Sequence, residues 1–112
     1  MDCLFCKIAA GEIPSDKVYE DEQVLVFRDI APAAPVHLLV IPKAHIGSAA
    51  ELSAENSGVV AHIFTVIARL AQELGLENGF RVVTNAGRDG GQTVPHLHFH
   101  LLAGRELTWP AG

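Results

Sequence analysis

The chain has 112 residues with 13 acidic and 8 basic side chains, which gives a formal net charge of −5 at neutral pH. This length predicts a single domain over residues 1–112, and the hydrophobic content of 49% is typical of a compact protein with apolar surface left for a partner. The acidic balance disfavours binding to nucleic acid, which needs a basic surface. No apolar run approaches the ~20 residues of a membrane span and no secretory signal is apparent, so we expect a cytoplasmic protein without membrane contact.

The first half of the chain predicts one short helix and three strands. The apolar residues 3–10 precede Gly11, which is typical of a helix end. Residues 17–19 and 24–29 read as two strands of a hairpin around an acidic turn. Residues 36–41 are almost wholly apolar and end before Pro42, a pattern that favours a strand in the centre of a sheet.

The second half predicts one long helix and two further strands. Apolar residues recur at helical spacing between Ser53 and Leu74, and Gly75 supplies the stop; the predicted buried stripe is Val60, Ile63, Phe64, Ile67, Ala71 and Leu74. Strands are expected over residues 80–84 and 96–102. One long helix is too few to connect parallel strands, so we predict an α+β fold with an antiparallel sheet of about five strands.

Three of the six histidines occupy alternate positions, His96, His98 and His100. In an extended strand their rings would line one face at intervals of roughly 6.5 to 7 Å, close enough to act on one small ligand. Histidine changes charge near neutral pH, so the pattern indicates proton transfer, nucleophilic attack or metal binding. Of the other histidines, His37 is expected in the core and His62 on the solvated face of the long helix.

A glycine-rich turn over residues 85–91 precedes the histidine strand, and Gln92 and Thr93 add side-chain donors beside it. Adjacent glycines let backbone N–H groups converge on an anion, so this loop is a candidate phosphate cradle. A histidine that attacks phosphorus needs a neutral nitrogen and donors for the phosphate oxygens. His98, at the middle of the three, is best placed to attack, with His96 and His100 beside it.

Cys3 and Cys6 form a C-x-x-C, a spacing that favours metal binding or a reduced thiol pair over a disulfide in a reducing compartment. Structural zinc takes four ligands from Cys and His. His45 and His96 are the natural second pair of donors. On spacing alone, a structural zinc site and a metal-free reduced pair both stay open.

The run His96-Leu97-His98-Phe99-His100-Leu101-Leu102 resembles the histidine triad motif, His-x-His-x-His followed by two apolar residues. The likeness to the Hint branch of the histidine triad (HIT) superfamily extends along nearly the full chain, through residues 5–8, 11–14, 27–30, 34–37, 40–46, 90–92 and 104–110. Two positions depart from the Hint pattern: Thr93 replaces the usual Ser, and Pro95 replaces an aromatic residue.

The resemblance implies a homodimer whose sheets join across the two-fold axis and an enzyme that hydrolyses the P–N bond of purine nucleoside 5′-phosphoramidates. It makes His98 the nucleophile that becomes nucleotidylated, with His100 and Thr93 completing the catalytic set, and releases a nucleoside monophosphate of the AMP or GMP class. Asp29 would bind the ribose hydroxyls, and Trp109 would reach toward the partner subunit. The base is expected against Leu4, Phe5, Ile13, Phe27 and Ile30, and the α-phosphate against Asn85, Gln92, Thr93 and His100.

The resemblance also implies zinc on Cys3, Cys6, His45 and His96, as a structural ion that catalysis does not require. Two other functions remain as alternatives. One is a zinc hydrolase in which the histidine face holds a catalytic metal, which would lose turnover on chelation. The other is a nucleotide-binding or partner-binding module without catalysis, which would bind a nucleoside monophosphate and turn over no phosphoramidate.

Overall fold

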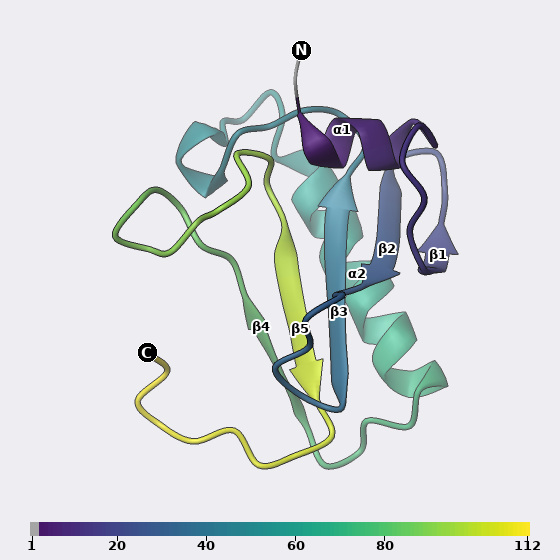
Figure 1. Ribbon diagram of the computed structural model, residues 1–112, viewed down its shortest axis with the longest axis vertical. Helices are drawn as coiled ribbons and strands as arrows, with labels where there is room; N and C mark the ends of the chain where they lie inside the picture. The colour runs from purple at the N-terminus through teal and green to yellow at the C-terminus, as the bar shows by residue number, and fades with distance from the viewer. Residues whose placement is uncertain (1–2) are drawn as a thin grey trace.

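The computed structural model describes residues 3–112 as one five-stranded antiparallel sheet with helices on its two faces (Figure 1). The elements in chain order are α1 (Leu4–Ala9), β1 (Lys17–Glu20), β2 (Val24–Arg28), β3 (Val36–Pro42), a 3-10 turn η1 (Ala49–Glu51), α2 (Gly58–Glu73), β4 (Phe80–Val83) and β5 (Phe99–Ala103). The strand order is β1-β2-β3-β5-β4. The predicted α+β fold and the central position of β3 are therefore confirmed.

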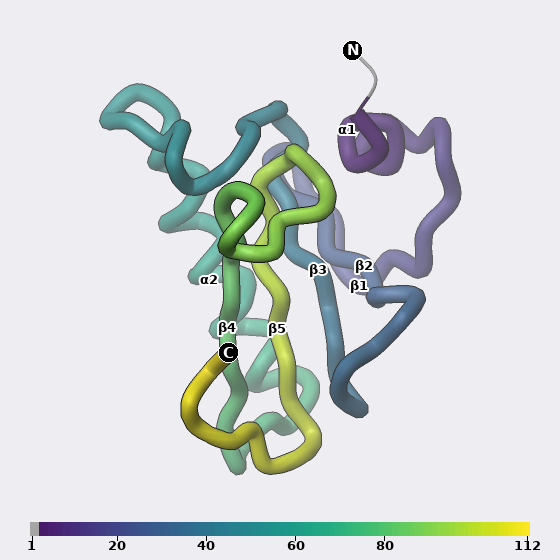
Figure 2. Tube along the Cα trace, turned by 60° about the vertical axis from the view of Figure 1, so that its left-hand side comes forward, coloured from purple at the N-terminus to yellow at the C-terminus, as the bar shows by residue number. Residues whose placement is uncertain are grey.

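The apolar runs of β2 and β3 are explained by burial of both faces of the sheet. Alternate residues of these strands, among them Val24 and Leu38, pack with α2 in one cluster, while the intervening residues, among them Leu25 and Leu39, pack with α1 in a second. Figure 2 shows α1 and α2 on opposite sides of the strands. Side chains of a strand alternate between faces, so a strand between two helices has no solvated side and reads as continuously apolar.

The long helix begins later than the sequence predicts, at Gly58 rather than Ser53. Asn56 accounts for the difference, because its side chain accepts a hydrogen bond from the Ser53 amide (2.8 Å) and donates one to the Glu51 carbonyl (3.1 Å). These bonds hold a turn that competes with helix formation. No helix among residues 3–112 combines the length and the apolarity needed to cross a bilayer.

The predicted apolar stripe of α2 is wrong at two positions. Ile63, Val66, Ile67 and Leu70 are buried, whereas Phe64 and Leu74 are 46% and 41% exposed. The buried face is therefore rotated away from Phe64, whose ring nevertheless contacts Phe99 with centroids 5.5 Å apart. The rotation leaves an apolar surface uncovered on the side of the helix that carries Phe64.

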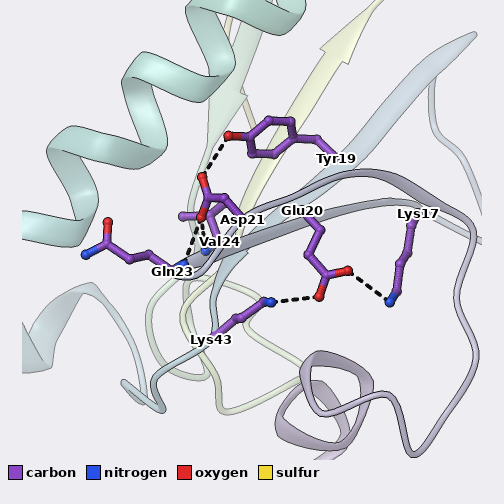
Figure 3. Close-up of polar contacts among 7 residues, drawn as sticks. All are labelled: Lys17, Tyr19, Glu20, Asp21, Gln23, Val24 and Lys43. Carbon is purple, nitrogen blue, oxygen red and sulfur yellow. Dashed lines mark hydrogen bonds and ion pairs between the residues drawn. The ribbon is translucent and has the colours of Figure 1, made fainter.

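The turn between β1 and β2 is built around the carboxylate of Asp21 (Figure 3). One oxygen accepts the backbone N–H groups of Gln23 and Val24 at 2.8 Å, and the other accepts the Tyr19 hydroxyl at 2.7 Å. His62 of α2, predicted to be solvated, places Nε2 2.6 Å from that second oxygen and is partly covered. Although burial opposes ionisation, these bonds hold the pKa of Asp21 well below its usual range. Asp21 thus ties the hairpin to the helix.

Candidate active site

The last strand is shorter than predicted and carries only one of the three alternating histidines. β5 begins at Phe99, so His96 and His98 lie in the irregular segment before it. The ladder with β3 ends at the pair Val40 and Phe99. Further on, Pro42 has no N–H to donate and its carbonyl accepts from the His96 ring at 2.8 Å, so regular pairing stops. The expected common face of three histidines is therefore divided into two sites.

His98 is held in one tautomer by the backbone. Its Nδ1–H donates to the carbonyl of His96 at 2.7 Å, which leaves Nε2 unprotonated in the neutral ring. The ring is 5% exposed and packs against the edge of Phe5, with centroids 5.2 Å apart. The carbonyl of His98 itself accepts the Thr84 hydroxyl at 2.8 Å. A fixed ring with a free nitrogen is the arrangement that a nucleophile requires.

His100 is connected to the backbone through His37, a contact that the sequence did not indicate. The N–H of Ala33 donates to Nδ1 of His37 at 3.0 Å, and Nε2 of His37 lies 2.9 Å from Nδ1 of His100. Because Nδ1 of His37 is an acceptor, its proton lies on Nε2 and is donated to His100. His100 therefore carries its own proton on Nε2. The predicted core position of His37 is confirmed, since the residue is buried.

The electrostatic setting favours neutral His100. Burial lowers its pKa, and the neighbouring His98 and His37 lower it further, while Asp29 opposes the shift. A neutral ring with Nε2–H presents one directed donor. The rings of His98 and His100 have centroids 5.1 Å apart, so the unprotonated nitrogen of His98 and the N–H donor of His100 belong to adjacent side chains.

Asp29 lies at the end of β2 beside this histidine pair. One oxygen accepts the Ala31 amide at 2.8 Å, and the other lies 3.5 Å from Nε2 of His37. The ligand atoms of Asp29, His37 and His100 fall within 4.8 Å of one another, a spacing that would also suit a metal ion. The proton on Nε2 of His37 occupies the position that a metal would need. The three residues therefore suit a hydrogen-bond chain better than a metal site.

A cavity of about 450 Å³ opens beside the histidines. Nine predicted site residues line it, and they are Leu4, Phe5, Ile13, Phe27, Asp29, Ile30, Thr93, His98 and His100. α1 and the ends of β2 supply its apolar wall. Other lining residues were not predicted from the sequence, among them Ile8, Leu39 and Val94, and the polar residues Ser15, Asp16 and Arg28. Alternation along β3 signals Leu39, because it shares a face with Ile41.

Two predicted phosphate residues, Asn85 and Gln92, are not among the residues that line this cavity. The side chain of Gln92 is engaged instead by three backbone groups. Its carbonyl oxygen accepts the Gly87 amide at 3.0 Å, and its amide nitrogen donates to the carbonyls of Gly47 (2.7 Å) and Val94 (2.9 Å). Gln92 thus fastens the glycine-rich turn to the segment after β3 and fixes the approach to Thr93.

The second site gathers Cys3, Cys6, His45 and His96, the four predicted zinc ligands, with their ligand atoms within 4.8 Å of one another. Nδ1 of His96 lies 3.3 Å from Sγ of Cys3 and 3.5 Å from Sγ of Cys6. Nδ1 of His45 lies 3.2 Å from Sγ of Cys6. Cys3 also caps α1, because its sulfur accepts the Cys6 amide at 3.3 Å. We call these four residues the Cys/His cluster.

The donor chemistry of the Cys/His cluster fits zinc. Zn–S bonds of about 2.3 Å and Zn–N bonds of about 2.1 Å separate sulfur from nitrogen by about 3.6 Å in a tetrahedron, close to the observed 3.2 to 3.5 Å. Nε2–H of His96 donates to the Pro42 carbonyl, so its lone pair is on Nδ1 and faces the sulfurs. Burial raises the pKa of the Cys6 thiol and Cys3 adds to the shift, which a bound cation would reverse.

Sheet, histidine pair and apolar cavity together define a small α+β protein with a histidine-based ligand site. The sequence matches the HIT domain family over residues 10–107, and the chain belongs to this family. It is 51% identical over 111 residues to an uncharacterized HIT-like protein of Synechococcus elongatus, covering 99% of this chain and 97% of the relative.

Solved structures agree with the sequence match. A HIT family hydrolase from Legionella pneumophila is 52% identical with a TM-score of 0.97, covering 99% of this chain and 100% of its own. A histidine triad protein from Clostridium difficile is 54% identical with a TM-score of 0.93, covering 96% and 95%. A histidine triad nucleotide-binding protein from Candida albicans is 35% identical with a TM-score of 0.82, covering 99% and 85%.

Proposed function

We propose that this protein is a hydrolase of purine nucleoside 5′-phosphoramidates, of the Hint type, acting through a nucleotidyl-histidine. The observation that carries the proposal is the fixed tautomer of His98 at the wall of the cavity, with Nε2 free. Similarity to a HIT family hydrolase and to a histidine triad nucleotide-binding protein supports both halves of the proposal, hydrolysis and a nucleotide substrate.

The reaction proceeds in two displacements at the α-phosphorus. Nε2 of His98 forms a bond to phosphorus while the P–N bond breaks, and the amine leaves after taking a proton. Water then attacks the phosphorus, the bond to His98 breaks, and the nucleoside monophosphate is released. Nε2–H of His100 and the hydroxyl of Thr93 donate to the phosphate oxygens as charge develops on them.

The remaining predicted residues bind the nucleotide. The base lies against Leu4, Phe5, Ile13, Phe27 and Ile30, which combine into the apolar wall of the cavity. Asp29 accepts the ribose hydroxyls with the carboxylate oxygen that faces His37. Asn85 and Gln92 contribute to phosphate binding from the loop that leads to Thr93. Because the Gln92 side chain is hydrogen-bonded to the backbone, its contribution is to hold Thr93 in position.

The Cys/His cluster holds structural zinc, and the protein works as a single-domain homodimer in the cytoplasm. Zinc would connect α1, which carries part of the base-binding wall, to the segment that holds His98.

The exposed Phe64 and the edge strand β4 supply apolar surface for a second subunit. Trp109, 81% exposed, lies on the C-terminal segment that Arg81 holds through the carbonyls of Leu107 and Thr108, and it reaches toward the partner's site.

The test is steady-state hydrolysis of adenosine 5′-phosphoramidate by the wild type and two histidine variants. We expect His98→Asn to reduce turnover by at least about 10³-fold, because the nucleophile is lost. The matched control is His62→Gln, which keeps a donor for Asp21 outside the cavity and retains wild-type turnover. An equally active His98→Asn variant would refute the proposal. Tight nucleoside monophosphate binding by a wild type that turns over no phosphoramidate would favour the non-catalytic module.

A further inference from the structure

The cavity contains a second set of polar groups, to which the proposed chemistry gives no task. Ser15 and Asp16 enter from the segment between α1 and β1, and Arg28 enters from the end of β2. The phosphate-handling residues come instead from β5, which holds His100, and from the irregular segment before it, which holds Thr93 and His98. The apolar wall for the base includes Ile13, two residues before Ser15, and Phe27, directly before Arg28.

Asp16 and Arg28 are fixed beside each other. The Arg28 amide donates to the Asp16 carbonyl at 3.0 Å, and Nε of Arg28 lies 3.3 Å from a carboxylate oxygen of Asp16. Their side chains are 70% and 55% exposed, so both retain unused acceptors and donors at the mouth of the cavity. The two carboxylate oxygens of Asp16, which accept hydrogen bonds, therefore lie next to the guanidinium group of Arg28, which donates them.

Ser15 adds a buried hydroxyl to this set. Its Oγ is buried and has no hydrogen-bond partner among residues 3–112. A buried hydroxyl without a partner costs free energy, and an accessible ligand group relieves that cost. Because this oxygen is covered, it contacts a ligand after rotation about χ1 to another staggered position.

We propose that Ser15, Asp16 and Arg28 read the purine base and give the protein a preference for guanine over adenine. The inference rests on the proposed function and names its substrate class. Guanine presents two adjacent donors, N1–H and the 2-amino group, followed by the O6 acceptor. The carboxylate of Asp16 accepts from both donors and Arg28 donates to O6. Adenine offers a single amino donor beside the N1 acceptor, so one carboxylate oxygen has no partner.

Ser15 has a different task in this arrangement. Its hydroxyl donates to a ring nitrogen that guanine and adenine share, so it increases affinity for both purines without distinguishing them. Asp16 distinguishes them. The two residues thus make separable contributions, one to the overall affinity for purine nucleotides and one to the ratio between two purines.

The experiment is calorimetric titration of the wild-type protein with GMP, IMP and AMP. We expect affinity in the order GMP, IMP, AMP, with about fivefold between GMP and AMP because the contacts lie at an exposed mouth. IMP lacks only the 2-amino group of GMP, so the GMP to IMP ratio isolates that contact. Asp16→Asn brings the GMP to AMP ratio to about one. Ser15→Ala weakens GMP and AMP equally and leaves their ratio unchanged.

Glu22→Gln is the matched control, since it removes the same charge from an exposed residue outside the cavity and preserves the GMP to AMP ratio. Equal GMP and AMP affinity in the wild type, together with hydrolysis of adenosine 5′-phosphoramidate, overturns the base-reading inference and leaves the proposed function intact. An Asp16→Asn variant that keeps the wild-type preference also overturns the inference. Absence of both nucleotide binding and turnover overturns the inference and the proposed function together.

Discussion

His37 offers a sharp test of how the active site is organised, because it contacts the histidine pair without lining the cavity. The perturbation is His37→Phe, which preserves ring volume in the core and removes both nitrogens. Ala33 is exposed, so its amide pairs with water and the fold is retained. Nδ1 of His100 loses its donor, and the ring is no longer fixed in the tautomer with Nε2–H.

The expected magnitude follows from that one hydrogen bond. Removing one partner of a partly buried hydrogen bond costs about 2 kcal/mol, and about 2 kcal/mol in the transition state corresponds to a decrease of about 30-fold in kcat. KM should change little, because His37 does not line the cavity in which the proposed function places the nucleotide. His37→Gln keeps an N–H donor and should retain more activity than His37→Phe.

The assay is steady-state kinetics with adenosine 5′-phosphoramidate, with folding checked by urea denaturation. His62→Phe is the control, since it removes a hydrogen-bonded histidine far from the cavity and should leave kcat unchanged. A His37→Phe variant with kcat within twofold of the wild type would show that His100 needs no partner on Nδ1. A loss of the same size in His62→Phe would show a general effect of stability.

Three further predictions concern the stability that Asp21 provides, the metal bound by the Cys/His cluster and the glycine-rich turn. Asp21→Asn should lower the free energy of unfolding by about 2 kcal/mol in urea titrations at pH 7. Because folding depresses the pKa of Asp21, its contribution to stability is full above about pH 4 and is lost as the pH falls further. The free energy of unfolding of the variant should therefore depend less on pH in the acid range. Elemental analysis should find one zinc per chain, and chelation should lower the melting temperature while turnover of the remaining folded protein persists; loss of turnover without loss of stability would favour the catalytic zinc alternative. Gln92→Ala should reduce kcat/KM about tenfold, because the glycine-rich turn loses the bonds that hold it in place. Unchanged kinetics would show that the position of this turn does not affect catalysis.

The features of the fold that follow from periodicity could be predicted from the sequence. The continuous apolar run of β3 predicted a strand in the centre of the sheet, and the structure adds that both faces are covered, since Leu38 and Leu39 enter opposite clusters. The start of α2 could not be predicted in the same way, because the side-chain bonds of Asn56 decide it and apolar spacing does not record them. The exposure of Phe64 depends on how the helix is rotated against the sheet.

In the candidate site, the types of residue could be predicted from the sequence, whereas their arrangement in space could not. The two cysteines and two histidines were predicted as a cluster from their residue types, and the fold brings them together although Cys3 and His96 are 93 positions apart in the sequence. Alternation predicted one common face for the three histidines, whereas Pro42 ends the ladder and His96 turns away. The bond between His37 and His100 depends on the register of β3 against β5, which no local pattern encodes.

Covalent catalysis by His98 can be observed by rapid quenching of a single turnover of adenosine 5′-phosphoramidate into base, followed by mass spectrometry of the peptides. We expect one acid-labile adenylyl group on the peptide that contains His98, appearing before AMP is released and absent from His98→Asn. Formation of AMP at the full rate with no adduct on that peptide at any time would contradict covalent catalysis by His98.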